Sequence, residues 1–156
     1  MNARRTIVVF LVDGQRYALP LSAVDRAVRA VAVTPLPEMP PQVLGAINVH
    51  GRVLPVLSLR RWLGRPVREI RPLDELLIAH TAAQTLVLVV DEVCGVAGCE
   101  PQDAVPAERV LEGAANIGEM LKLEEGLVLL LDLDRLLTGS EADAVAQAWP
   151  APESVL

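Results

Sequence analysis

Length, composition and charge set the first limits on what this chain can be. Its 156 residues are enough for one compact domain or for two small ones with a common core, and 52% are hydrophobic against 22% charged, as in a globular protein. Aromatic residues make up only 3%, so the core is aliphatic, and a formal charge of -6 argues against binding to a phosphate backbone and therefore to nucleic acid.

The sequence also points to a protein of the cytoplasm. No apolar run approaches the roughly 18 residues that a membrane-spanning helix needs, and the opening stretch MNARRTIVVFLVDGQ lacks the features of a signal peptide. Two cysteines are too few for a disulfide framework and fit a reducing compartment. We therefore expect a cytoplasmic protein with no direct membrane insertion.

Short aliphatic runs recur along the chain and are separated by turn signals. In chain order the runs are residues 6–12, 15–21, 27–33, 52–57, 75–81, 85–93 and 127–133, with turn signals at Asp13-Gly14, Pro40-Pro41, His50-Gly51, residues 82–84 and Glu125-Gly126. This spacing predicts a mostly β protein built of hairpins. Apolar and polar residues do not alternate strictly in residues 86–90 and 127–131, so we expect those strands to be covered on both faces.

The stretch NVHGRVLPVLSLRRWLG, residues 48–64, predicts a hairpin that leads into a short helix. Gly51 suits the tight turn, and residues 53–57 form the second strand. Pro55 places that strand at a sheet edge or at a bend, because proline lacks an N–H. Ser58 is expected to cap the helical turn that follows.

An internal repeat is the most informative feature of the sequence. It lays VLPVLSLRRWL, which begins at Val53, over LVLLLDLDRLL, which begins at Leu127, so that Leu57 aligns with Leu131 and Arg61 with Arg135. Each copy is a strand that runs into a short amphipathic helix. The repeat therefore predicts two related small β-barrels. Each would have only a marginal core of its own, so we expect them to pack against one another around a shared core.

The composition changes near the end of the chain, which reads EADAVAQAWPAPESVL. Residues 141–156 are expected to form a C-terminal helix and tail, with the helix over residues 142–149 ended by Pro150 and Pro152. We expect the final residues to fray.

Candidate metal ligands are Cys94, Cys99, His50 and His80, but their pattern is poor. The two cysteines lie further apart than those of a usual zinc knuckle, and neither histidine has a partner at helical spacing. We therefore expect no metal and two core thiols. A cysteine-based metal or redox regulator stays open as an alternative from another functional class.

The sequence holds no catalytic constellation that we recognise. Asp13 and Asp91 could suggest an aspartic protease, but neither is followed by the Thr or Ser and then Gly that such a site needs. No phosphate-binding glycine loop, G-x-S-x-G or H-E-x-x-H motif occurs. Asp132 and Asp134 are interpreted as carboxylates at a helix N-terminus. The chain is therefore expected to be neither an enzyme nor a cofactor-binding protein.

The stretch VLGAINVHGRVLPVLSLRRWLG, residues 43–64, resembles the CheW family of chemotaxis coupling proteins. The matching residues are Gly45, Asn48, Gly51, Pro55, Val56 and Leu59. The likeness continues in order through FLVDGQRYALPLSAV, TPLPEMPPQVLG, LVLVVDEVCGV and GEMLKLEEGLVLLLDLDRLL, and so spans residues 7–137.

This resemblance implies a fold, a function and partners. The fold is two SH3-like five-stranded β-barrels with a shared hydrophobic core and short helices, in a single domain over residues 1–140 whose barrels can exchange terminal strands. The function is that of a cytoplasmic adaptor, which links the cytoplasmic tips of methyl-accepting chemoreceptors to the regulatory domain of a CheA-type histidine kinase by binding, without turnover. A scaffold for a kinase array with a non-motility output is the alternative within the same class.

The resemblance also implies binding residues. The receptor-binding groove between the barrels would involve Val24, Arg26, Gly45, Asn48, His50 and Gly51. The kinase-binding surface would involve Val8, Leu21 and Val24. For these residues a purely structural role, in a turn, at a strand end or in the core, stays open.

Two positions depart from the family pattern. His50 stands where the family usually has an arginine, and Arg26 where it has an acidic residue, so the ion pair expected between them is absent. Either a neutral His50 accepts a hydrogen bond from Arg26, or Arg26 faces solvent and pairs with Asp25 or with nothing. An uncompensated Arg26 would be available to an acidic group on the partner.

Overall fold

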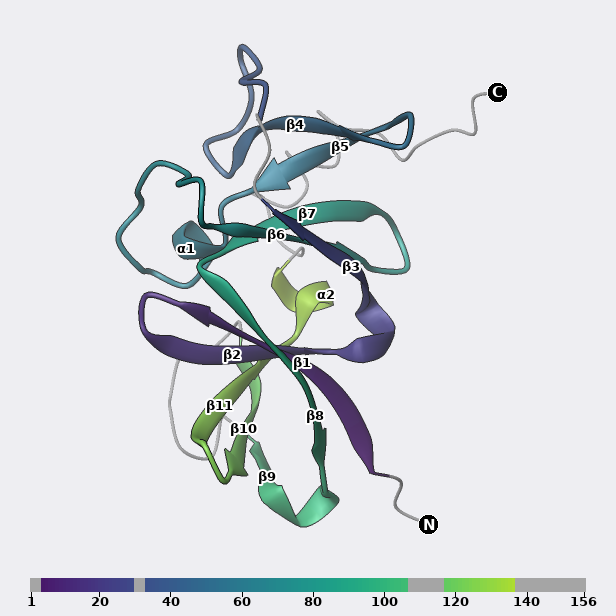
Figure 1. Cartoon of the computed structure of the whole chain (residues 1–156), viewed down its shortest axis with the longest axis vertical. Helices are drawn as coiled ribbons and strands as arrows, with labels where there is room; N and C mark the ends of the chain where they lie inside the picture. Colours follow the sequence, from purple (N-terminus) through teal and green to yellow (C-terminus); the bar gives the residue numbers. More distant parts are fainter. Residues whose placement is uncertain (1–3, 30–32, 107–116, 137–156) are drawn as a thin grey trace.

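The computed structural model describes residues 4–29, 33–106 and 117–136. Within these ranges the chain forms two β-sheets joined by short helical turns (Figure 1). The C-terminal helix predicted over residues 142–149 lies outside the described residues, as do the two prolines after it.

The first sheet, which we call the terminal sheet, combines strands from both ends of the chain. In spatial order its strands are β8 (Glu92–Cys99), β1 (Arg5–Val12), β2 (Gln15–Pro20), β11 (Gly126–Leu131), β10 (Ile117–Leu123) and β9 (Ala104–Pro106). β11 runs parallel to β2, and the other neighbouring pairs are antiparallel. Its helical turns are η1 (Leu21–Ala23) after β2, η2 (Pro101–Asp103) before β9, and α2 (Leu133–Leu136) after β11.

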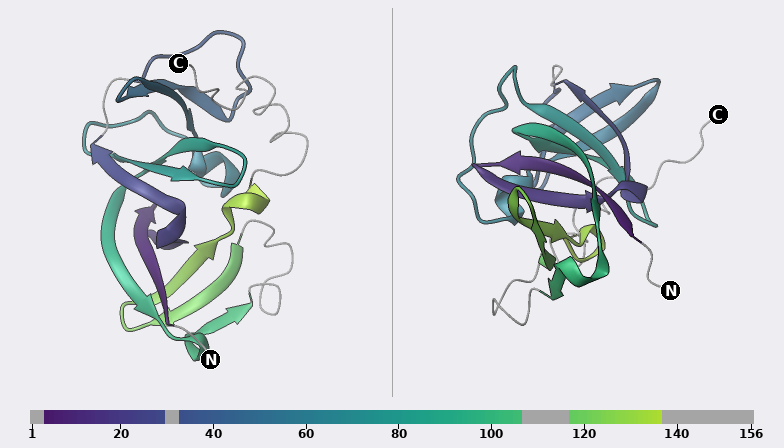
Figure 2. Two further views of the ribbon diagram at one scale, coloured as in Figure 1. Left: turned by 90° about the vertical axis from the view of Figure 1, so that its right-hand side faces the viewer. Right: turned by 60° about the horizontal axis from the view of Figure 1, so that its bottom comes forward.

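The second sheet, which we call the central sheet, is built from the middle of the chain. In spatial order its strands are β3 (Val24–Arg29), β6 (Glu75–His80), β7 (Thr85–Val90), β5 (Arg52–Leu57) and β4 (Val43–Val49), and the helix α1 (Leu59–Trp62) follows β5. Each sheet curls into a small barrel, and the two barrels lie end to end (Figure 2). The prediction of a mostly β fold with two barrels is confirmed, although the terminal sheet has a sixth strand, the short β9.

The turn signals lie where the sequence indicated. Asp13 and Gly14 close the β1–β2 hairpin, and His50 and Gly51 close β4–β5, all four with positive φ. Two-residue hairpin turns of this kind need positive φ at both central residues, which explains the glycine at the second. Pro55 is not on an edge strand, because β5 lies between β4 and β7, but the pairing with β7 begins only at the residue after it.

The repeat seen in the sequence is a structural repeat. Its two copies are β4–β5–α1 and β10–β11–α2, and one constant offset along the chain relates the bounds of every element in the first copy to those in the second. The hairpins β1–β2 and β6–β7 are a second pair of copies. In the terminal sheet Leu130 pairs with Ala18, and in the central sheet its counterpart Val56 pairs with Val87. Ala18 and Val87 therefore occupy equivalent positions. The β1–β2 hairpin therefore completes the sheet of β10 and β11, and β6–β7 completes that of β4 and β5.

One hydrophobic core lies between the barrels, and a smaller one lies inside each. The shared core contains Leu57 and Leu131, the pair aligned by the repeat, with 0% and 2% of their surface exposed. Leu59 and Leu133, at the starts of α1 and α2, are buried in the same core. Separation of the barrels would thus expose equivalent leucines from both copies of the repeat.

Candidate functional site

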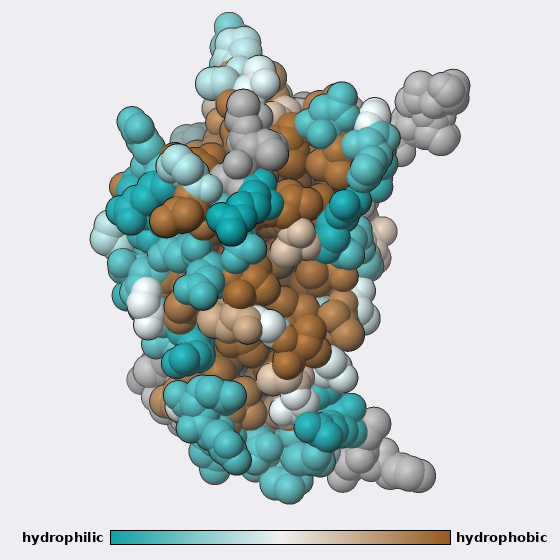
Figure 3. Space-filling model, in the orientation of Figure 1, coloured by the Kyte–Doolittle hydropathy of each residue, from teal (hydrophilic) through white to brown (hydrophobic). Residues whose placement is uncertain are grey.

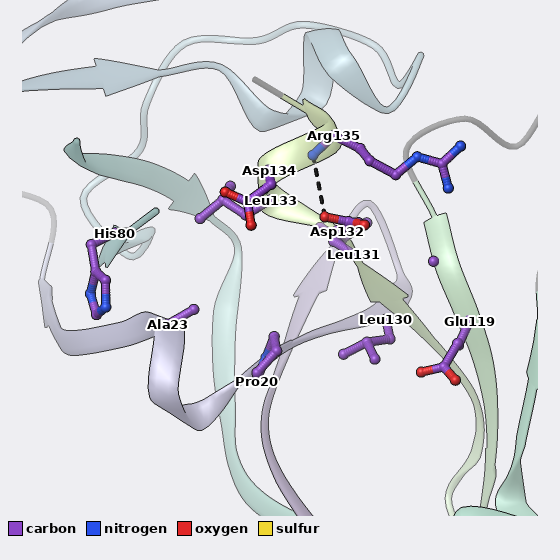
Figure 4. A pocket seen from close by; sticks show the side chains of 11 residues that line it. Pro20, Ala23, His80, Glu119, Leu130, Leu131, Asp132, Leu133, Asp134 and Arg135 are labelled. Carbon is purple, nitrogen blue, oxygen red and sulfur yellow. Dashed lines mark hydrogen bonds between the residues drawn. The ribbon is translucent and has the colours of Figure 1, made fainter. Parts of the chain in front are cut away.

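A cleft of about 390 Å³ opens between the barrels, where α2 faces η1 (Figure 4). Its lining residues are Pro20, Ala23, His80, Gly118, Glu119, Leu130, Leu131, Asp132, Leu133, Asp134 and Arg135. Both barrels contribute to it, because His80 ends a strand of the central sheet while β2, β10 and β11 belong to the terminal sheet. The cleft is therefore a product of how the two barrels meet.

A second hollow of about 460 Å³ adjoins the cleft and shares Pro20 and Leu130 with it. Arg5, Thr6, Ile7, Leu21 and Ser22 complete its mainly apolar lining. Leu21 is 42% exposed, so its side chain is open to contact from a partner. Figure 3 shows hydrophobic surface across the middle of the molecule, where the two barrels meet. We call the cleft and the hollow together the trough.

Charged groups beside the cleft are partly paired with each other. The His80 ring contacts Asp25, with 2.8 Å between Nδ1 and Oδ1, and Arg5 donates from Nη1 to Oε1 of Glu119 at 2.7 Å. The hydrogen bond with Glu119 raises the pKa of Arg5 in spite of its partial burial, so the guanidinium stays charged. These two pairs leave little free charge on their side of the cleft.

The start of α2 contributes two carboxylates. Asp132 precedes the helix, as its predicted place at a helix N-terminus requires, and its Oδ1 accepts a hydrogen bond from the backbone N–H of Arg135 at 3.2 Å, which caps the first turn. Asp134 is exposed, and no hydrogen bond or ion pair among the described residues engages its carboxylate. The described part of the cleft thus combines apolar walls with an uncompensated negative charge.

The barrels also meet next to α1, at a contact that we call the α1 joint. Ion pairs close this joint. Arg60 donates to both carboxylate oxygens of Asp91 at 3.0 Å, and Arg68 reaches the same carboxylate at 2.8 Å. The backbone N–H of Asp13, in the β1–β2 turn, also donates to Asp91 at 2.8 Å. Residues 63–74, which we call the strap, carry Arg68 to this joint.

Asp74 anchors the end of the strap. Its side chain is 4% exposed and accepts two hydrogen bonds from Arg68 at 2.8 Å and one from the backbone N–H of Arg71 at 2.7 Å. Burial by itself would raise the pKa of Asp74, but the hydrogen bonds from Arg68 and Arg71 outweigh it and hold the pKa below its ordinary value. A buried charge is strongly unfavourable without its partner, so we expect the strap and this joint to form together.

The kinase-binding residues implied by the resemblance lie in two environments. Leu21 lines the trough, and Val24 follows directly after Ala23 of the cleft, so both are beside it. Val8, in contrast, is 5% exposed in the shared core. Its strand β1 has a partner on each side, and the face that carries Val8 is covered by the shared core, so the side chain is not on the surface of the free chain.

Most of the implied receptor-binding residues lie on the β4–β5 hairpin, away from α2 and the cleft (Figures 1 and 2). Gly45 has a φ of 153°, and a Cβ there would overlap the carbonyl oxygen of Thr34, so a close approach of two backbones explains this glycine. Asn48 Oδ1 accepts a hydrogen bond from the backbone N–H of Gly51 at 2.8 Å, which supports the turn. These residues therefore have structural roles, and their binding roles stay predictions.

Arg26 and His50 are not paired with each other. None of the hydrogen bonds and ion pairs in the described ranges joins them, and Asp25 pairs with His80 rather than with Arg26. Arg26 is exposed on β3, and His50 is exposed in the β4–β5 turn. Of the alternatives for Arg26, the structure favours a side chain that faces solvent.

The cysteines form no common site in the described part of the chain. Cys99 is buried as expected, but Cys94 is exposed, so the prediction of two core thiols is wrong for Cys94. Both cysteines are free, and burial raises the pKa of each thiol. No group of three or more His, Cys, Asp or Glu side chains in the described ranges could hold a metal ion. In the same ranges, none of the helices is long and apolar enough to cross a membrane.

Sequence patterns do not identify the residues whose ion pairs close the α1 joint, nor the residues that line the cleft next to α2. Arg60, Asp74 and Asp91 form a network only because of how the barrels meet, and their spacing in the sequence gives no sign of it. One usable signal exists. The repeat aligns Arg60 with Asp134, which marks a reversal of charge between its two copies.

Comparison with known proteins agrees with this geometry. Residues 6–141 match the family model described as the CheW-like domain. Over 146 residues the chain is 27% identical to the chemotaxis protein CheW of Rhizobium meliloti (strain 1021), which covers 92% of this chain and 94% of that protein. Over 143 residues it is 30% identical to protein FrzA of Myxococcus xanthus, which covers 88% of each.

The fold is also similar to that of a solved protein, the scaffolding protein TtCheW from Thermoanaerobacter tengcongensis. The TM-score is 0.80 at 25% identity, over 90% of this chain and 96% of that one. The family match covers both barrels and includes residues 43–64, which carry the resemblance seen in the sequence. The chain therefore belongs to the family of proteins with a CheW-like domain.

Proposed function

We propose that this chain is a non-catalytic adaptor of a chemotaxis-like signalling pathway. Its family supports this, as do relatives that are themselves named chemotaxis or scaffolding proteins. The proposed partners are the cytoplasmic tip of a methyl-accepting chemoreceptor and the regulatory domain of a CheA-type histidine kinase. The adaptor then works in the cytoplasm, where it holds the two together by binding alone.

The observation that carries this proposal is the trough between the barrels. Its two hollows, of about 390 and 460 Å³, adjoin at Pro20 and Leu130 and form an extended and largely apolar depression. A receptor tip is a helical hairpin, and amphipathic helices bind in apolar grooves through the side chains of one face. We therefore assign the receptor tip to the trough, beside Val24.

The kinase is assigned to the exposed rim of the trough at Leu21, which lines the hollow. Leu21 is exposed and Val24 half-buried, so both can contact a partner, whereas Val8 can act on kinase binding only through the core that it helps to form. Receptor and kinase would then lie side by side on the adaptor. A second receptor contact is assigned to the following residues of β3 and of the β4–β5 hairpin: Arg26, Gly45, Asn48, His50 and Gly51.

Isothermal titration of the kinase regulatory domain against Leu21→Asp tests the assignment of Leu21. Because Leu21 is 42% exposed, the replacement should leave the fold intact. The affinity is expected to fall about ten-fold, since the new carboxylate would lose its water in an apolar contact. Leu127→Asp is the matched control, because Leu127 is 51% exposed on the same barrel and does not line the trough.

The outcomes separate the parts of the proposal. Equal affinities of Leu21→Asp and the wild type would remove Leu21 from the kinase site. Failure of the wild-type chain to bind either the kinase domain or a receptor-tip fragment would remove the adaptor function as a whole.

A further inference from the structure

The internal repeat relates the two joints between the barrels to each other. The alignment of β4–β5–α1 with β10–β11–α2 carries Leu59 and Arg60 of α1 onto Leu133 and Asp134 of α2. The hairpins β1–β2 and β6–β7 are aligned by the correspondence of Ala18 with Val87. When this alignment is extended past the ends of the hairpins, Ser22 of the trough corresponds to Asp91. Leu59 and Leu133 are both buried in the shared core. The joint next to α1 and the cleft next to α2 are therefore two versions of one site.

At the α1 joint, this site is occupied by the chain itself. Arg60 pairs with Asp91 at 3.0 Å, and the strap follows α1 directly. Trp62 of α1 and Leu63, the first residue of the strap, pack against the shared core. The occupied version of the site thus combines apolar side chains with an arginine–carboxylate pair.

At the α2 cleft, the helix carries the opposite charge. Asp134 stands in the place of Arg60, and Ser22 stands in the place of Asp91, so here the helix carries a carboxylate and its counterpart position carries a neutral serine. Figure 4 shows the Asp134 side chain on the side of α2 that is turned toward the end of β6, while the guanidinium of Arg135 extends away from it.

Asp134 differs in this respect from the other carboxylates around the cleft. Glu119 and Asp25 each have a basic partner, and Asp132 caps α2. Asp134 has no partner among the described residues. A ligand that covered it with apolar groups alone would bury an unpaired charge, which is strongly unfavourable.

We propose that the segment which binds in the trough carries an arginine or a lysine that pairs with Asp134, next to apolar side chains that fill the hollows. This inference rests on the proposed function, because the segment is taken to be a helix of the receptor tip. The closed joint supplies the geometric precedent, since Arg60 there engages both oxygens of one carboxylate. Such a pair at the rim of an apolar contact mainly controls which segment binds, and salt weakens it.

The test is isothermal titration of a two-helix receptor-tip fragment, from a chemoreceptor of the same cell, against the full chain. Asp134→Lys is expected to weaken binding about ten-fold at about 50 mM salt and about two-fold at about 500 mM, because salt screens the new repulsion. Asp134→Asn should show a smaller loss. Glu124→Lys is the matched control, since Glu124 is exposed in the β10–β11 turn outside the trough, and it should bind as the wild type does.

A charge swap on the fragment completes the experiment. Each arginine and lysine is replaced in turn by glutamate, and one of these variants should bind Asp134→Lys about five-fold more tightly than the unchanged fragment does. Equal binding of the wild type and Asp134→Lys, or the lack of any rescuing swap, would overturn this inference and leave receptor binding intact. No binding by the wild-type chain would overturn the proposed function, and the inference with it.

Discussion

Truncation of the two leucines aligned by the repeat tests whether the barrels share one core. Leu57 and Leu131 are 0% and 2% exposed in the same hydrophobic cluster. Replacement of such a leucine by alanine costs about 2 to 5 kcal/mol, from the lost burial of its methyl groups and from the cavity that remains. Because the two positions are equivalent and equally buried, Leu57→Ala and Leu131→Ala should agree within about 1 kcal/mol.

Urea unfolding followed by circular dichroism measures these free energies of unfolding, and hydrogen exchange in β6 and β11 reports on each barrel separately. A shared core predicts one transition in which both sheets lose protection together, whichever leucine is truncated. Leu127→Ala is the control, because Leu127 is 51% exposed on β11, and it should cost less than about 1 kcal/mol.

Two results would refute this reasoning. A loss near zero for either buried leucine would show that its site is not filled by the shared core. Loss of protection confined to the terminal sheet in Leu131→Ala, and to the central sheet in Leu57→Ala, would show that each barrel has an independent core.

Three further measurements test other parts of the structure. Asp74→Asn should be less stable than the wild type at neutral pH, and the difference should shrink below about pH 4: the folded pKa of Asp74 is lowered, so its stabilisation is present above the ordinary value of 3.8 and is lost as pH falls through the folded pKa. Unfolding free energies measured across this pH range check it, and a difference independent of pH would contradict it. Gly45→Ala should lower the free energy of unfolding by about 2 kcal/mol or more, and with it the melting temperature, because the new Cβ would overlap the Thr34 carbonyl oxygen. An unchanged melting temperature is incompatible with that close approach. Arg26→Glu should fold normally and bind the receptor-tip fragment more weakly than the wild type does, and this loss of affinity should be larger at low salt than at high salt. Equal affinities of the variant and the wild type at both salt concentrations would show that the exposed Arg26 takes no part in recognition.

Much of the fold can be predicted from local residue patterns. The pairs Asp13-Gly14 and His50-Gly51 indicate hairpin turns, because their residue types favour the positive φ that such turns need. The alignment of Leu57 with Leu131 predicts two related units with a common core, because neither unit is large enough to bury its leucines alone. Both patterns act within short stretches of chain, where sequence and local structure correspond closely.

Local patterns do not report which strand pairs with which. Hydrophobic periodicity indicates the faces of a strand and not its neighbours, so residues 5–20 give no sign that their hairpin lies between β8 and β11. Val8 shows the effect, because its place in the shared core depends on that assembly. The cleft depends on it too, and the missing counter-charge of Asp134 becomes visible only when the surrounding side chains are known.

The division of the terminal sheet between the two ends of the chain has a consequence for synthesis on the ribosome. β1 and β2 are made first, yet their sheet partners β8 and β11 follow the whole central sheet. The central barrel can close once β7 has emerged, and β8, which follows directly, can then pair with β1, while the edge of β2 stays unpaired until β11 arrives. During that interval, neighbouring nascent chains on one messenger present the same open edges to each other. An exchange of hairpins between them would give an intertwined dimer that retains the native strand pairings.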